Sequence, residues 1–189
     1  SIFGIKFFAT GGIGGVHLNA ENTYDVSADL YSLSEHSNYV ICSGAKSILD
    51  LNKTYELLET LGITRIGYKT DYMPGFWYSE TKHQVDNNFE KVSDISNFLK
   101  LNSKLKHNKS ILIFNKVPEI NAISKEQINE WISSALVRAE KNKISGKALT
   151  PFLIKEINNF SNNKTLKANV SLIINNADLA GKIAKNFYS

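Results

Sequence analysis

Apolar residues gather in four short runs along the chain, each bounded by polar or glycine-rich residues. The runs extend from Phe3 to Ala9, Tyr39 to Ser43, Ile63 to Lys69 and Ser110 to Asn115. Short, mostly apolar runs without a helical period are typical of buried strands. The pattern therefore predicts four strands that are covered on both faces.

Elsewhere, apolar residues recur every three or four positions, which is typical of amphipathic helices. Ser124, with Gln127 three residues later, marks one helix start as a capping box. Strands that alternate with helices predict an α/β protein, layered α/β/α with a largely parallel central sheet. The predicted helices span residues 46–62, 90–101, 124–143, 151–160 and 165–187.

Composition narrows the class of protein. The chain has 189 residues, 42% hydrophobic and 21% charged, which is ordinary for one globular domain. Its apolar runs are far shorter than the roughly 20 residues of a membrane-spanning helix. The net charge of +4 is spread over many lysines, so a phosphorylated small molecule suits it at least as well as nucleic acid. We expect neither a membrane nor a nucleic-acid partner.

The single cysteine, Cys42, excludes an internal disulfide and a multi-cysteine zinc site. It lies within a predicted strand, where a small buried hydrophobe is the simplest interpretation. A reduced, cytoplasmic compartment follows as the expectation. The chain opens directly in a strand-like segment without the pattern of a signal peptide, so we expect that it starts within a domain.

A glycine-rich loop, TGGIGGVH from Thr10 to His17, follows the first predicted strand. Ligands bind at the carboxyl ends of parallel strands, and glycines such as Gly14 and Gly15 let backbone N–H groups approach a phosphate. The spacing matches neither the Walker pattern nor the dinucleotide fingerprint, so a tight turn against a helix remains an alternative. His17 is placed for phosphate binding or proton transfer, although a lone histidine is more often structural.

Two aspartates follow this loop. Asp25 and Asp29 are four residues apart, and on a helix their carboxylates would share one face. A helix cap explains Asp25 without any ligand, but Asp29 is one turn further in. A metal at this point would be Mg²⁺ or Mn²⁺, held mostly through water.

Lys46 follows the second predicted strand directly. If the next helix starts near Ser47, the Lys46 ammonium lies at the positive end of the helix dipole. That field favours the neutral amine, which is the form that attacks a carbonyl to make an imine. The alternatives are an ordinary surface lysine and a cation that binds phosphate.

Two later segments carry weaker signals. The loop from Lys69 to Glu80 holds Phe76 and Trp77, which could wall a pocket, although a core role is the simpler interpretation. Asn169 shares a face of the last predicted helix with Asn176. Its amide could meet the edge of a nucleobase or could bond to backbone.

Taken together, several motifs resemble one known family, the pseudouridine-5'-phosphate glycosidases, also described as indigoidine synthase A-like. The motifs occur in the family's order from Phe8 nearly to the C-terminus, and their co-occurrence carries the resemblance. They read FATGGIGGVH, DVSADL, SGAKSILDL, LETLGI, TDYMPGFW, VPE, GKALTPFL and ANVSLIINNADLAGKIA.

The resemblance implies reversible cleavage of the carbon–carbon glycosidic bond of pseudouridine 5'-phosphate, giving uracil and ribose 5-phosphate through a lysine imine. It also implies Mn²⁺ as cofactor and a homotrimer. The glycine loop, with Gly14 and Gly15, would bring backbone against the phosphorylated ribose. The other implied roles are Lys46 as nucleophile, Asp29 as metal ligand, His17 beside the sugar phosphate, Thr10 and Ser27 in the substrate pocket, and Asn169 at the base.

Family members carry about a hundred further residues upstream, which supply an acidic proton-transfer residue and a phosphate-binding lysine. We therefore expect residues 1–189 to be the C-terminal part of a single glycosidase domain, with an upstream segment as partner. Two other functions stay open. One is a different imine-forming enzyme that acts on sugar phosphates, and the other is an inactive fragment that binds phosphorylated ligands or RNA.

Overall fold

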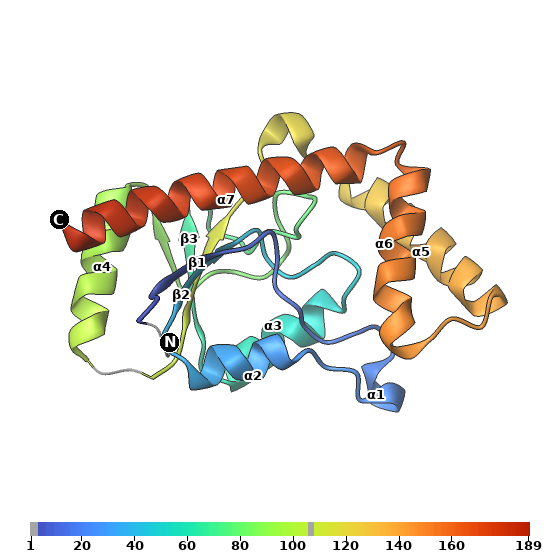
Figure 1. Cartoon of the computed structure of the whole chain (residues 1–189), viewed down its shortest axis with the longest axis horizontal. Helices are drawn as coiled ribbons and strands as arrows, with labels where there is room; N and C mark the ends of the chain where they lie inside the picture. The colour runs from blue at the N-terminus through green and yellow to red at the C-terminus, as the bar shows by residue number, and fades with distance from the viewer. Residues whose placement is uncertain (1–3, 106–107) are drawn as a thin grey trace.

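The chain forms a parallel sheet between two layers of helices (Figure 1). The computed structural model describes residues 4–105 and 108–189, and every strand pairing in that part of the chain is parallel. The strands lie in the order β1-β2-β5-β3-β4. Their bounds are Phe7–Ala9 for β1, Tyr39–Cys42 for β2, Thr64–Tyr68 for β3, Asn87–Phe89 for β4 and Ile111–Asn115 for β5.

Helices cover both faces of the sheet. The long α7 crosses one face beside α4, whereas α2 and α3 lie on the opposite side, and α5 and α6 form a pair beyond one end of the sheet (Figure 1). The helices are α1 (Ala20–Thr23), α2 (Ala28–Glu35), α3 (Leu51–Thr60), α4 (Val92–Lys104), α5 (Lys125–Lys141), α6 (Leu149–Phe160) and α7 (Lys164–Tyr188), and short 3₁₀ turns span Glu119–Asn121 and Gly146–Ala148.

Alternate side chains of the central strands supply two separate cores. Along β2, Val40 and Cys42 belong to the core that includes Leu30 of α2 and Leu58 of α3. Ile41 belongs to the other core, with residues of α4 and α7. A strand buried on both faces by helices reads as a continuous apolar run, which is why β2 and β5 were recognisable. The predicted α/β/α layering is confirmed.

The largest differences from the predicted boundaries are at the starts of the first strand and of α3. The first strand begins at Phe7, and the predicted start at Phe3 lies outside the described residues. The predicted helix over residues 46–62 begins only at Leu51, where the Asp50 carboxylate caps it by accepting from the Lys53 N–H at 3.0 Å. The backbone N–H groups of Lys46 and Asp50 instead donate to the Ile13 and Val16 carbonyls of the glycine loop.

Cys42 is fully buried and free, as predicted for a small hydrophobe. Burial raises the pKa of its thiol to about 12. Among the helices of the described residues, none combines the length and the apolar character that crossing a bilayer requires.

Candidate active site

The glycine loop extends the pairing of β1 and β2 beyond the ends of both strands. The Ser43 N–H donates to the Gly11 carbonyl at 2.9 Å, and the Ile13 N–H donates to the Gly44 carbonyl at 3.0 Å. The Ile13 carbonyl then accepts from the Lys46 N–H at 3.1 Å. These bonds hold the backbone at Lys46 in a fixed position against the loop.

Gly14 and Gly15 are needed for close approach to neighbouring elements. A Cβ at Gly14 would lie 2.2 Å from the Ser27 hydroxyl oxygen and 2.9 Å from Asp29 Oδ2, and one at Gly15 would lie 2.4 Å from Thr54 Oγ1. The Gly14 N–H donates to Asp29 Oδ2 at 2.7 Å. The anion that this amide holds in the structure is therefore the Asp29 carboxylate, which lies between the loop and α2.

Helix α2 begins later than the aspartate spacing suggested. Ser27 is its N-cap, and the Ser27 hydroxyl accepts from the Asp29 N–H at 3.2 Å. Asp25 precedes the helix, where its carbonyl accepts from the His17 N–H and its carboxylate lies 3.8 Å from His17 Nδ1. The prediction that Asp25 and Asp29 share a helix face is wrong, because the cap falls on Ser27.

Two cavities meet at Lys46. The larger, of about 660 Å³, is lined by Thr10, Asp29 and Lys46 together with apolar residues of β1 and β2. The smaller, of about 250 Å³, is lined by Thr10, Lys46 and Asn169. Four of the residues singled out from the sequence therefore border one connected region, although they come from four separate segments.

The Lys46 side chain is half-buried and, among the described residues, has no carboxylate within 4.0 Å of its ammonium. A lysine at a cavity without such a partner is available to a ligand. The helix-dipole argument for its activation is wrong, because α3 begins five residues later at Leu51. What sets Lys46 apart is its place between the cavities.

The loop after β3 forms a wall of the smaller cavity and also enters the core. Phe76 and Trp77 are buried in the core that includes α2 and α3, and both line the smaller cavity. The Phe76 N–H donates to the Ser43 carbonyl at 2.9 Å, and the Ser47 hydroxyl donates to the Gly75 carbonyl at 2.6 Å. The wall and the segment that carries Lys46 are thus bonded together, and both sequence interpretations of the loop hold.

Asn169 and Asn176 have different roles on α7. Asn169 accepts a hydrogen bond from the Trp77 indole N–H at 2.7 Å. Asn176 is fully buried. Its amide donates to the Thr10 carbonyl at 2.8 Å and to the Ser43 hydroxyl at 3.1 Å, and accepts from Asn115 Nδ2 at 3.1 Å.

Asn176 therefore ties together the carboxyl ends of β1, β2 and β5, a role that the sequence reasoning missed. The available signal was an asparagine at a helix position that the apolar spacing marks as buried. Such an amide needs partners for both its donors and its acceptor.

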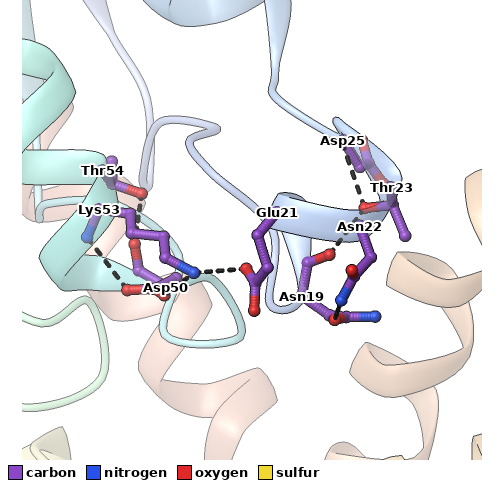
Figure 2. Close-up of polar contacts among 8 residues, drawn as sticks. All are labelled: Asn19, Glu21, Asn22, Thr23, Asp25, Asp50, Lys53 and Thr54. Carbon is purple, nitrogen blue, oxygen red and sulfur yellow. Dashed lines mark hydrogen bonds and ion pairs between the residues drawn. The ribbon is translucent and has the colours of Figure 1, made fainter.

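His17 lies outside the linings of both cavities, in the segment that leads to α1. Figure 2 shows how the following turn is anchored: the Lys53 ammonium lies between the carboxylates of Glu21 and Asp50, and the Thr54 hydroxyl donates to the Asp50 carbonyl. These contacts join α1 to the start of α3. Because His17 lines neither cavity, a direct role for it stays a prediction.

The donor set for a metal ion is small. The described residues contain no group of three or more His, Cys, Asp or Glu side chains that could hold an ion. Asp29 uses one carboxylate oxygen for the Gly14 amide, which leaves the other oxygen for a cation. This arrangement does not fit an ion bound directly by several protein ligands.

Relatives of known sequence cover nearly the whole chain. It is 44% identical over 187 residues to a pseudouridine-5'-phosphate glycosidase of Brachyspira hyodysenteriae, a match that spans 99% of this chain and 61% of the relative. The corresponding protein of Kosmotoga olearia is 45% identical over 181 residues, or 96% of this chain and 62% of the relative. The chain thus spans about three fifths of the length of these relatives.

Solved structures share the fold. A prealnumycin C-glycosynthase in complex with ribulose 5-phosphate superposes with a TM-score of 0.90 at 31% identity, covering 97% of this chain and 61% of that one. An indigoidine synthase A-like protein from Thermotoga maritima gives a TM-score of 0.86 at 34% identity, covering 97% and 60%. The family model for indigoidine synthase A like proteins matches residues 1–186. The chain therefore belongs to the indigoidine synthase A-like family.

Proposed function

We propose that this chain carries the nucleophile and the base pocket of a pseudouridine-5'-phosphate glycosidase. The observation that carries the proposal is the position of Lys46 between two cavities, with no carboxylate partner in the described part of the chain. The names of the relatives, at 44–45% identity, support this substrate. Because the chain spans only part of their length, the activity of the whole enzyme is part of the proposal.

The chemistry is simplest in the direction of synthesis. The neutral Lys46 amine adds to the aldehyde carbon of open-chain ribose 5-phosphate and water leaves, which gives an imine. The imine carbon then accepts an electron pair from C5 of uracil and forms the carbon–carbon bond. The C–N π electrons move to the lysine nitrogen, which takes up a proton in balance with the one that C5 loses. Closure of the sugar ring expels the lysine amine. Cleavage follows the same steps in reverse.

The two cavities suggest how the substrate divides. The larger one, with Thr10 and Asp29, suits the polar ribose phosphate, and the smaller one, with Phe76, Trp77 and Asn169, suits a flat base. Gly14, Gly15 and Ser27 line neither cavity. Gly14 and Ser27 bond to Asp29, and Gly15 accepts from the Ser27 N–H, so their contact with the substrate remains part of the proposal. A role for His17 beside the sugar phosphate remains part of the proposal, drawn from the family resemblance.

An Mn²⁺ requirement, a homotrimer and a covering upstream segment complete the proposal. With a single available oxygen on Asp29, an Mn²⁺ ion would keep most of its water. The need for a cover is supported by Ile5 and Phe8, which line the larger cavity and are 60% and 56% exposed. Phe8 belongs to β1, which is an edge strand of the sheet, and Ile5 precedes that strand.

The test is chemical trapping. The chain is incubated with ribose 5-phosphate and Mn²⁺, reduced with borohydride and mapped by peptide mass. We expect a sugar adduct on Lys46 in the wild type and in a Lys53→Arg control, and none in Lys46→Arg. Consumption of ribose 5-phosphate that depends on uracil must accompany the adduct.

A second function, another imine-forming enzyme of sugar phosphates, is favoured by the structural relative that holds ribulose 5-phosphate. It shares the Lys46 adduct but not the dependence on uracil. Sugar-phosphate binding with neither adduct nor turnover, even after the upstream segment of a relative is supplied, would instead identify a non-catalytic binding protein. The same trapping experiment therefore separates all three functions.

A further inference from the structure

The hydrogen bond between Trp77 and Asn169 determines which way the Asn169 amide faces. Trp77 lies in the loop after β3 and Asn169 on α7, and the indole nitrogen lies 2.7 Å from Oδ1. An indole N–H can only donate. The atom that faces it must therefore be the amide oxygen, and the amide nitrogen must face away.

The amide nitrogen of Asn169 is left for a ligand. No described residue accepts a hydrogen bond from Asn169 Nδ2. Among the described residues, every fully buried side-chain nitrogen or oxygen has a hydrogen-bond partner, so a nitrogen without one is not fully buried. The nitrogen is therefore accessible. Asn169 lines the smaller cavity and also a further cavity between α6 and the start of α7. Toward a ligand in the smaller cavity its amide nitrogen can donate, while its oxygen is engaged by Trp77.

Trp77 is itself held firmly, so it can impose this orientation. Its side chain is 2% exposed. Its backbone carbonyl accepts from the Ile123 N–H at 2.8 Å. Its backbone N–H donates to the hydroxyl oxygen of Ser47, the residue next to Lys46, at 3.4 Å. The preceding residue, Phe76, adopts a φ of 70°, a conformation that a bulky residue keeps only where its surroundings require it.

We propose that Trp77 is a positioning residue for base selectivity. By engaging the Asn169 oxygen it leaves the amide N–H groups to face the base, where they pair with the C4 carbonyl of uracil and not with the C4 amino group of cytosine. The inference rests on the proposed function and deepens it. Uracil presents two carbonyl oxygens, whereas cytosine presents an amino group in place of one of them. An amide free to rotate could serve either edge, but an amide locked by Trp77 favours the carbonyl.

The test replaces Trp77 by Phe, which keeps an aromatic ring and removes the N–H. We expect the KM for uracil to rise about three- to tenfold, the effect of losing one hydrogen bond that orients the amide. The ratio of uracil to cytosine binding, measured by calorimetry with ribose 5-phosphate present, should fall by a similar factor. The KM for ribose 5-phosphate and the yield of the Lys46 adduct should stay within about twofold.

Trp131→Phe is the matched control, because Trp131 packs against the core from α5 and lines neither cavity. A second measurement needs no turnover: the indole N–H resonance of Trp77, assigned by its loss in Trp77→Phe, should shift on addition of uracil in the wild type. In Asn169→Leu, which removes the acceptor, that resonance should move toward the position of a solvent-exposed indole and should no longer respond to uracil.

The outcomes distinguish this inference from the proposed function. Uracil-dependent turnover with an unchanged uracil KM and selectivity in Trp77→Phe would overturn the role of Trp77 and leave the glycosidase intact. A Lys46 adduct without any dependence on uracil would overturn both. A rise in the KM for uracil that the control variant does not share supports both.

Discussion

Replacing Asn176 by Leu is the sharpest test of how the site is held together. Leucine has a similar volume, so the change removes the amide without leaving a large cavity. The Thr10 carbonyl, the Ser43 hydroxyl and Asn115 Nδ2 would then lose the amide partner that the structure gives them. All three groups face a side chain that is fully buried.

The expected loss follows from these three groups. Leaving a buried polar group unpaired costs about 1–3 kcal/mol, and Ser43 can recover part of its bonding by rotating its hydroxyl. We therefore expect the free energy of unfolding to fall by about 3–6 kcal/mol. That is a large share of the roughly 5–15 kcal/mol that stabilises a typical domain.

The measurement is equilibrium unfolding in urea followed by circular dichroism. With an m value of about 2 kcal/mol/M, the midpoint should fall by roughly 1.5–3 M. The control is Asn186→Leu on the same helix, where the exposed amide donates only to the Lys182 carbonyl one turn earlier, and we expect a change below about 0.5 kcal/mol. A loss below about 1 kcal/mol in Asn176→Leu would refute the idea that this amide ties the strand ends together.

Three further predictions concern single residues. Gly14→Ala should destabilise the fold and displace Asp29, because the new Cβ would overlap the Ser27 hydroxyl. Gly181→Ala in α7 should stabilise the fold by up to about 1 kcal/mol, because its Cβ would meet nothing within 4 Å and alanine favours a helix. Thermal unfolding of both variants checks this. Cys42, with a pKa of about 12 and no exposure, should resist alkylation at pH 8 and react only in denaturant, so rapid labelling of the folded chain would contradict its burial. Lys46→Arg should keep the melting temperature within about 2 °C and abolish the borohydride adduct, because Lys46 is only half-buried and makes no ion pair among the described residues; retained trapping would exclude Lys46 as the nucleophile.

The sequence predicted the elements whose apolar pattern is strong and missed those that neighbours determine. β2 and β5 are buried on both faces, so their composition identified them. β4 was not predicted, because Asn87 and Asn88 are exposed and become a strand only by pairing with β3 at the sheet edge. The start of α3 was misplaced because long-range bonds to Ile13 hold Lys46 outside the helix.

The candidate site was predictable to the extent that parallel strands gather their carboxyl ends. Thr10 and Lys46 each follow a strand, and β1 and β2 are neighbours, so these residues meet at one edge. The contact of Trp77 with Asn169 joins positions 92 residues apart, and no local pattern encodes it. The polarity of that amide, and hence its selectivity, needed the three-dimensional contact.

The position of α7 along the chain has a consequence for synthesis of the protein. This helix supplies both Asn169 and Asn176, while the strand ends and the glycine loop that they hold are made more than fifty residues earlier. A nascent chain in which α7 is not yet made therefore has an incomplete smaller cavity, and the ends of its strands lack the Asn176 amide. The smaller cavity is complete only once α7 has emerged from the ribosome, because Asn169 and Ile173 of that helix line it.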